Sequence, residues 1–269
     1  MKEVTRRGFL VTAGALAAGG GVAALVEAGV LPGRERAARA LGRCGELPAP
    51  PPRPPGPVEE HTLRAGGETV RAVIGRPPGA RPGPPLPVAV LLHGGGGNAR
   101  TPFDVYAIQN YLADAVAEGT PPFAVASVDR WFLDGLVTDR LLPFLADRGL
   151  ATGRFGLLGW SMGGDGALRL AAEQGRARVA AVVATSPAVD DTDARSYARR
   201  LTGIPVWAGC GDHDSFAEPT EELLATLRDA GERPQGGIYP GCHDAAFRRR
   251  MLPRQLPFLG HRLAGGTDD

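Results

Sequence analysis

The chain has 269 residues, of which 43% are hydrophobic and 22% charged, and its 30 basic and 29 acidic side chains give a formal net charge of +1. This balance favours neither nucleic-acid binding nor strong electrostatic steering to a membrane surface. Without the leader and the Pro-rich stretch described below, roughly 210 residues are left, which is the size of one α/β domain.

The N-terminal residues 1–40 resemble a twin-arginine export signal. Residues 5–10 read Thr-Arg-Arg-Gly-Phe-Leu, and a weakly hydrophobic stretch rich in Ala and Gly follows them. This combination predicts an exported protein, either secreted or associated with the cell envelope. Residues 8–31 are long enough to span a bilayer, but their glycines and Glu27 argue against a durable anchor, so membrane association through this stretch stays an open alternative.

A Pro-rich linker, residues 41–58, is expected between this leader and a single domain formed by residues 59–269. Within the domain, short apolar runs alternate with helical patterns. This alternation predicts an α/β domain with a mainly parallel central sheet and helices on both faces. The expected strands lie near residues 70–74, 88–92, 123–128, 155–158, 179–184, 204–208 and 236–239.

A glycine-rich loop follows the apolar run at residues 88–92. Residues 93–98 read His-Gly-Gly-Gly-Gly-Asn, and such glycines let the backbone approach a substrate carbonyl closely. A phosphate-binding loop is the rival interpretation, but the sequence lacks a G-x-x-x-x-G-K-[ST] pattern and its single lysine is Lys2. We therefore expect no nucleotide site, and a merely flexible linker stays the alternative.

Residues 159–163 read Gly-Trp-Ser-Met-Gly and place a G-x-S-x-G motif between an apolar run and a helical pattern. In this motif the serine occupies a sharp strand-to-helix turn, where flanking side chains would clash and glycine has none. The turn lifts the hydroxyl out of the sheet, so Ser161 is the candidate nucleophile, with an ordinary turn serine as the alternative. The N–H of Met162 is then expected to donate one hydrogen bond to the oxyanion.

Five histidines compete for the role of general base, which a serine hydroxyl needs before it can attack. Histidine suits this role because its reference pKa of about 6.5 lies near working pH. The chain order serine, acid, histidine excludes His61 and His93. His213 lies in the segment that better supplies the acid, and His261 lies in a polar tail. His243, in a turn-rich stretch before a helical pattern, is the best candidate, although a surface loop histidine would look similar.

The acid is expected just after the apolar run at residues 204–208. A carboxylate there must orient the imidazole and stabilise its charged form. The following loop holds both Asp212 and Asp214. Spacing alone does not separate them, because the acid merely has to emerge beyond the end of a strand beside the histidine loop.

Three cysteines allow one disulfide and one free thiol in an exported protein. Cys210 and Cys242 flank the proposed acid and histidine loops, so we hypothesise a bond between them. A bond from Cys44 to either of them, or three buried free thiols, are the alternatives. The Cys and His residues lack metal-ligand spacing, so we expect neither a metal nor another cofactor.

A family resemblance extends over roughly residues 88–259, with firm motifs at four short places, one of which is the His-Gly pair at residues 93–94. Residues 159–168, Gly-Trp-Ser-Met-Gly-Gly-Asp-Gly-Ala-Leu, resemble the G-x-S-M-G-G-x-G-A-L elbow of the esterase D group of α/β-hydrolases. This group includes S-formylglutathione hydrolases and is related to the antigen 85 mycolyltransferases. Residues 210–216 are similar to the C/Q-G-x-x-D-x-F segment that carries the acid in the group, and residues 243–247 resemble the histidine loop of secreted actinobacterial esterases.

The resemblance implies an α/β-hydrolase fold and a particular set of site residues. It favours Asp214 over Asp212 as the acid, supports His243 as the base and implies that the N–H of Gly95 is the second oxyanion donor.

The sequence departs from these relatives at two places. Between Asp129 and Leu141 the relatives carry a longer segment, rich in aromatic and histidine residues, that lines the substrate pocket, whereas this chain has only Arg-Trp-Phe at residues 130–132. Arg248 stands where relatives often carry tryptophan. We expect the run at residues 248–250 to form a solvated helix face and not a nucleic-acid site.

Together these residues predict an exported serine esterase that forms an acyl-enzyme and releases it to water. A cell-envelope acyltransferase of the antigen 85 type would use the same intermediate but deliver the acyl group to a sugar or lipid alcohol. A noncatalytic binding protein that retains the fold is the alternative from a different class. The expected partner is a small-molecule, lipid or sugar ester.

Overall fold

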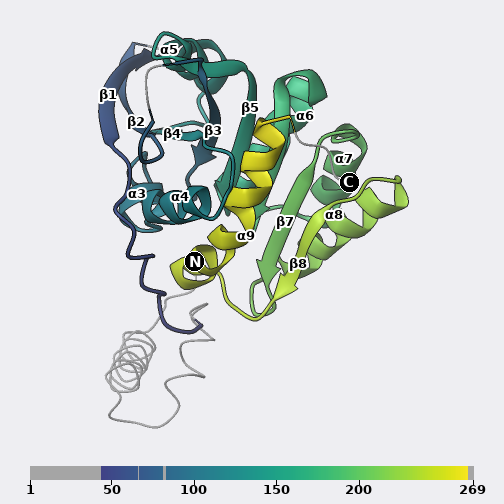
Figure 1. Ribbon diagram of the computed structural model, residues 1–269. Coiled ribbons are helices and arrows are strands. Elements are labelled where there is room, and N and C mark those ends of the chain that lie inside the picture. The colour runs from purple at the N-terminus through teal and green to yellow at the C-terminus, as the bar shows by residue number, and fades with distance from the viewer. Residues whose placement is uncertain (1–43, 66, 81–82, 266–269) are drawn as a thin grey trace, which may run out of the picture.

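A single eight-stranded sheet forms the centre of the computed structural model, which describes residues 44–65, 67–80 and 83–265 (Figure 1). The predicted export leader lies outside the described residues. The strand order is β1-β2-β4-β3-β5-β6-β7-β8. Strand β2 pairs antiparallel with both β1 and β4, and the six strands from β4 to β8 in this order are parallel to one another. The strands are β1 (Val58–Ala65), β2 (Glu68–Gly75), β3 (Leu86–Leu92), β4 (Ala124–Val128), β5 (Leu150–Trp160), β6 (Val179–Thr185), β7 (Val206–Gly211) and β8 (Gln235–Tyr239).

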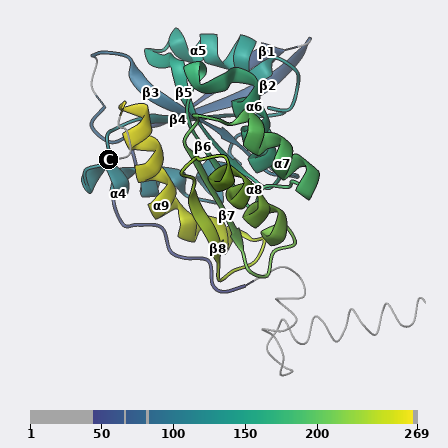
Figure 2. The same ribbon diagram turned by 90° about the vertical axis from the view of Figure 1, so that its right-hand side faces the viewer.

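Helices cover both faces of this sheet, as the two views together show (Figures 1 and 2). On one face lie α3 (Thr101–Asp104), α4 (Ile108–Ala117) and the long C-terminal α9 (Ala245–Leu263). On the other face lie the π-helical turn η1 (Leu136–Leu141), α5 (Leu142–Ala146), α6 (Met162–Arg178), α7 (Asp191–Arg200) and α8 (Ala217–Asp229). The predicted fold class, α/β with a mainly parallel sheet covered on both sides, is confirmed.

The hydrophobic pattern of each element explains its place. All residues of the central strand β6 are buried, because helices cover both of its faces and no position along it meets solvent. Helix α4 instead presents one apolar stripe to the sheet. The stripe consists of buried residues that recur at helical spacing, namely Ile108, Tyr111, Leu112 and Ala115. Two apolar cores result, one on each face of the sheet.

The described part of the predicted linker, residues 44–57, runs along the domain to β1. The guanidinium of Arg53 donates to Asp114 on α4 at 2.9 Å, and the Asn110 amide donates to the Pro51 carbonyl at 3.4 Å. We call residues 44–57 the N-terminal arm. None of the described helices combines the length and the apolar character that a membrane-spanning segment requires.

Candidate active site

Ser161 lies at the carboxyl end of β5, in a backbone conformation that few side chains adopt. Its φ is 56° and its ψ is −123°, a strained combination for a residue with a Cβ. Backbone hydrogen bonds hold it there. The Ser161 N–H donates to the Thr185 carbonyl at 3.0 Å, and the Ser161 carbonyl accepts from the N–H groups of Gly164 at 2.8 Å and Ala188 at 3.1 Å. The strand-to-helix elbow predicted from the glycine spacing is therefore present.

The glycines of the elbow are required by close backbone contacts. A Cβ atom at Gly159 would overlap the carbonyl of Gly163, and a Cβ atom at Gly163 would overlap the carbonyl of Leu92. The first contact closes the turn, and the second packs the start of α6 against the end of β3. The spacing of the motif thus follows from backbone atoms that leave no room for side chains.

The structure brings Ser161, His243 and Asp214 into one chain of hydrogen bonds. The His243 Nε2 atom lies 2.9 Å from the Ser161 Oγ, and the His243 Nδ1 atom lies 2.8 Å from the Asp214 Oδ2. Because an ionised carboxylate only accepts, Nδ1 carries the proton and Nε2 accepts from the Ser161 hydroxyl. The three residues come from the loops after β5, β8 and β7, which all end at the same edge of the sheet.

The Asp214 carboxylate is buried yet remains an acid that ionises readily. Its side chain has 0% exposure, against 29% for His243. Burial alone would raise the pKa of Asp214, but hydrogen bonds from His243, the Phe216 N–H and the Ser186 hydroxyl outweigh it, so the pKa is lowered. The negative charge that orients the imidazole is therefore retained at neutral pH.

The neighbouring carboxylate, Asp212, has a different place. It is exposed, and its Oδ1 accepts from the Gly241 N–H at 2.9 Å, which links the acid loop to the histidine loop. The His243 Nδ1–H donates to Asp214 and not to Asp212. The structure thus separates the two aspartates that sequence spacing left equivalent.

The other histidines lie away from the Ser161 hydroxyl or are buried. His213 and His261 are exposed, and His61 pairs with Glu59 on β1 at 3.2 Å. His93 is buried at the end of β3, where its carbonyl accepts from the Trp131 indole N–H at 2.9 Å.

The glycine-rich loop lies directly against the serine. A Cβ atom at Gly94 would lie 3.2 Å from the Ser161 Cβ. The Gly97 N–H donates to the Gly94 carbonyl at 3.1 Å, and Gly96 has a φ of 71°, so residues 94–97 form a tight turn that leaves the Gly95 N–H unused by the turn itself. Met162 is the first residue of α6, where an N–H has no acceptor within its helix. The Met162 N–H, directly after Ser161, and the Gly95 N–H, in the loop that contacts Ser161 through Gly94, therefore lack the partners that a helix or turn would give them.

Sequence reasoning missed Ser186, which lies buried behind the acid. It follows β6, has a φ of 47° and donates its backbone N–H to the Gly209 carbonyl at 2.8 Å. Its hydroxyl bonds to Asp214 and also accepts from the Cys210 thiol at 3.7 Å. The available signal was a serine before Pro187, just after an apolar strand that ends in Thr185, and this is too common to indicate such a role.

The cysteines pair differently from the hypothesis of a Cys210–Cys242 bond. The disulfide joins Cys44 to Cys242, with a Cα–Cα distance of 5.2 Å, and Cys210 is a buried free thiol. The hypothesis was wrong because the Cys210 thiol faces the Ser186 hydroxyl, whereas the N-terminal arm brings Cys44 to Cys242. Burial and the nearby Asp214 charge raise the pKa of Cys210 to about 12, so this thiol is protonated at neutral pH.

The arginine run at residues 248–250 is not the solvated face that we expected. Arg249 is buried, and its guanidinium donates to the Pro48 carbonyl at 2.7 Å and the Val105 carbonyl at 3.0 Å. The Arg248 guanidinium donates to the Tyr106 hydroxyl at 2.9 Å. The Arg250 guanidinium donates to the Pro240 carbonyl at 3.0 Å, so all three side chains bond to polar atoms of the protein itself.

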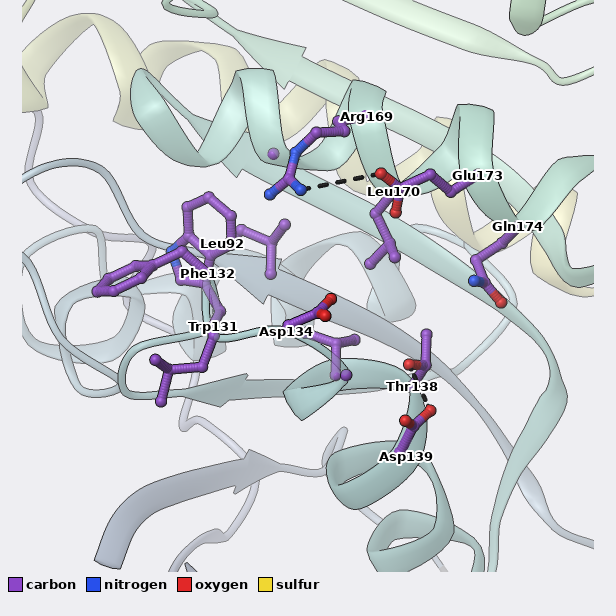
Figure 3. Close-up of a pocket in the computed structure, with 14 residues that line it drawn as sticks. Leu92, Trp131, Phe132, Asp134, Thr138, Asp139, Arg169, Leu170, Glu173 and Gln174 are labelled. Atoms are coloured by element: carbon purple, nitrogen blue, oxygen red, sulfur yellow. Dashed lines mark hydrogen bonds and ion pairs between the residues drawn. The ribbon is translucent and has the colours of Figure 1, made fainter. Parts of the chain in front are cut away.

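A groove of about 570 Å³ lies beside the site, between α6 and the segment that follows β4 (Figure 3). Trp131, Phe132 and Asp134 come from that segment, while Arg169 and Glu173 face them from α6. Ser161, Asp214 and His243 do not line this groove. The segment after β4 therefore lines a hollow on the flank of α6.

The described residues contain no group of three or more His, Cys, Asp or Glu side chains arranged to hold a metal ion.

Comparison with solved structures finds esterases of the same fold. The feruloyl esterase module from Clostridium thermocellum, complexed with sinapinate, is 18% identical with a TM-score of 0.67, over 84% of this chain and 98% of that one. S-formylglutathione hydrolase from Agrobacterium tumefaciens is 17% identical with a TM-score of 0.59, over 77% and 94%. The fluorophosphonate-binding serine hydrolase F from Staphylococcus aureus is 16% identical with a TM-score of 0.62, over 77% and 99%.

The sheet order, the elbow and these neighbours define the chain as a protein of the α/β-hydrolase fold. The resemblance to esterase D relatives is supported to that extent, since the structural neighbours include feruloyl esterases and S-formylglutathione hydrolases. No protein-family model matches the sequence, and a search of curated proteins finds no match.

Proposed function

We propose that this protein is a serine esterase that hydrolyses carboxylic esters. The observation that carries the proposal is the unbroken chain of hydrogen bonds from Asp214 through His243 to Ser161, which lies on a strained elbow at the edge of the sheet. A serine used only for structure would need neither the elbow nor a histidine oriented by a buried carboxylate. The esterase neighbours support the same chemistry.

In the proposed reaction, Ser161 attacks the ester carbonyl while His243 takes the hydroxyl proton, and Asp214 stabilises the resulting imidazolium. The N–H groups of Gly95 and Met162 donate to the oxyanion as charge develops on it. His243 then protonates the leaving alcohol, and an acyl-enzyme forms on Ser161. A water molecule, deprotonated by His243, attacks this acyl group and restores the free serine.

We further propose that the protein is exported, as a member of the secreted actinobacterial branch of esterases that its histidine loop resembles. The twin-arginine pattern of the leader supports export. The Cys44–Cys242 disulfide supports it independently, because disulfides persist in oxidising compartments outside the cytoplasm.

Hydrolysis of short-chain and medium-chain p-nitrophenyl esters by the purified, oxidised full chain tests the proposal. We expect Ser161→Ala, His243→Ala and Asp214→Asn each to lower kcat/KM by about 10⁴-fold or more, as in other triads. Asp212→Asn is the matched control, since it changes a neighbouring carboxylate of the same loop, and we expect it to retain most of the activity.

Two further readouts separate the alternatives. A fluorophosphonate probe should label Ser161 in the wild type and not in Ser161→Ala. Turnover absent on every ester, together with absent labelling, would favour a noncatalytic binding protein. If added sugar or lipid alcohols gave transfer products faster than hydrolysis, the acyltransferase alternative would replace the esterase.

A further inference from the structure

The N-terminal arm is bonded covalently to the loop that carries the general base. Cys44 and Cys242, 198 positions apart in the sequence, form the disulfide, and Cys242 directly precedes His243. Cys242 is fully buried. The residue on one side of the base is therefore fixed to a segment that the sequence places outside the domain.

The residue on the other side of the base is fixed by the same part of the arm. The Cys44 N–H donates to the Asp244 Oδ2 at 2.7 Å, while the Asp244 Oδ1 accepts from the Phe247 N–H at 2.8 Å and caps the start of α9. One carboxylate thus connects the arm to the first turn of the helix. Both chain neighbours of His243 are held by Cys44, one through its sulfur and one through its backbone.

The arm is itself anchored along its length, so it is a fixed support for the loop. The buried Arg249 guanidinium donates to the Pro48 carbonyl at 2.7 Å. The Asn110 amide donates to the carbonyls of Pro51 at 3.4 Å and Arg53 at 3.3 Å. These contacts tie the arm to α9 and α4, which pack against the sheet that also carries Ser161.

The histidine loop needs such support because it is short and partly exposed. Residues 240–244 connect β8 to α9, and the His243 side chain is 29% exposed. Its Nε2 must stay within hydrogen-bond distance of Ser161, and a displacement of about 1 Å in such a group costs roughly 100-fold in rate.

We propose that Cys44 and Asp244 are positioning residues that set His243 against Ser161, so that the Cys44 end of the N-terminal arm positions the general base although it touches no reacting atom. The inference rests on the esterase function proposed above. It predicts that release of the arm near Cys44 lowers kcat, whereas release of its other end does not.

Three variants test the proposal. Cys44→Ser/Cys242→Ser removes the disulfide. Asp244→Asn keeps the disulfide and the helix cap, since asparagine caps as well as aspartate, but presents an NH₂ group to the Cys44 N–H. Arg53→Ala is the matched control, because it breaks the exposed ion pair with Asp114 at the far end of the arm.

We expect both near-end variants to lower kcat about tenfold or more, with KM within about twofold of the wild type, because substrate contacts are intact while the base is displaced. Fluorophosphonate labelling of Ser161 should slow in parallel. Arg53→Ala should match the wild type in both. Thermal unfolding of each variant is measured alongside, and rates are compared well below the lowest midpoint. A folded Cys44→Ser/Cys242→Ser and a folded Asp244→Asn with wild-type kcat would overturn the proposal.

The downfield NMR signal of the proton between His243 and Asp214 gives a readout without turnover. We expect the signal in the wild type and in Arg53→Ala, and its broadening or loss in both near-end variants. If no ester is hydrolysed but the signal still depends on Cys44 and Asp244, the esterase function fails and the positioning role stands. An unchanged signal in both near-end variants would refute the positioning role whatever the protein hydrolyses.

Discussion

Gly163 lies against the backbone of Leu92, so that a Cβ atom at position 163 would overlap the Leu92 carbonyl. Leu92 ends β3 and leads directly into the glycine-rich loop, while Gly163 is the second residue of α6. The elbow that presents Ser161 and the loop that holds Gly95 are therefore packed backbone against backbone. Their relative position follows from this contact.

We expect a substitution at Gly163 to move the elbow that presents Ser161 away from the loop that holds Gly95. We expect Gly163→Ala to lower the free energy of unfolding by about 1–3 kcal/mol, the usual cost of forcing extra volume into a packed region. Ester hydrolysis should fall by more than the unfolded fraction of the variant explains, because the oxyanion loop moves away from Ser161. Urea unfolding and ester hydrolysis measure the two effects. Gly153→Ala is the control, since its Cβ meets no atom within 4 Å, and equal behaviour of the two variants would contradict the argument.

The lowered pKa of Asp214 makes stability depend on pH with a definite sign. Burial opposes ionisation of this carboxyl, but the hydrogen bonds from His243, Phe216 and Ser186 reverse the effect. The stabilisation is present above the unfolded pKa of about 3.9 and is lost as the pH falls through the lower folded value. Urea unfolding of the wild type and Asp214→Asn from about pH 6 downward measures it. We expect the stability difference between them to shrink with acid, and parallel curves would disprove this assignment.

We expect the Ser186 hydroxyl to stabilise the ionised carboxylate of Asp214. Ser186→Ala removes a hydroxyl bond to a buried charged group, so we expect a loss of about 1.5–3 kcal/mol at neutral pH. The pKa of Asp214 should rise as this donor is lost, which moves the acid-dependent loss of stability to higher pH. Chemical unfolding across the same pH range detects both changes. The exposed neighbour Ser215 supplies the control Ser215→Ala, which should leave the profile unchanged.

The local sequence pattern predicted those structural features that depend on residues close together in the chain. The elbow at Ser161 could be found because its glycines are required by contacts within a few positions and at one neighbouring strand. Strands such as β6 appear as continuous apolar runs because both faces are covered. The edge strand β1 was missed, since its sequence Val-Glu-Glu-His-Thr-Leu-Arg-Ala places polar residues toward solvent and has no apolar run.

Long-range placement was beyond such patterns. The partner of Cys242 depends on the path of the arm over the domain, which brings Cys44 from 198 positions away. The burial of Arg249 depends on two backbone carbonyls, of Pro48 and Val105, that no local pattern connects with α9. The distinction between Asp212 and Asp214 likewise depends on which carboxylate the fold turns toward His243.

Asp165 carries a partly buried carboxylate that the proposed mechanism does not use. It lies in the first turn of α6, four residues after Ser161, and its Oδ1 accepts from the Tyr197 hydroxyl at 2.6 Å. Burial raises the pKa of Asp165, and the Tyr197 hydrogen bond offsets the rise only in part.

Removal of the Tyr197 hydroxyl and removal of the Asp165 charge should therefore change the free energy of unfolding in opposite directions. Tyr197→Phe leaves the carboxylate without its donor, and we expect it to destabilise the protein by about 1–3 kcal/mol at neutral pH. Asp165→Asn keeps an acceptor for Tyr197 and removes the partly buried charge, so it should be at least as stable as the wild type. Because the folded pKa lies above the unfolded one, ionisation disfavours the folded state, and the wild type should lose stability relative to Asp165→Asn as the pH rises through the folded value. Urea unfolding of the three proteins from acid to neutral pH tests this order, which would be wrong if Asp165→Asn were the least stable at pH 7.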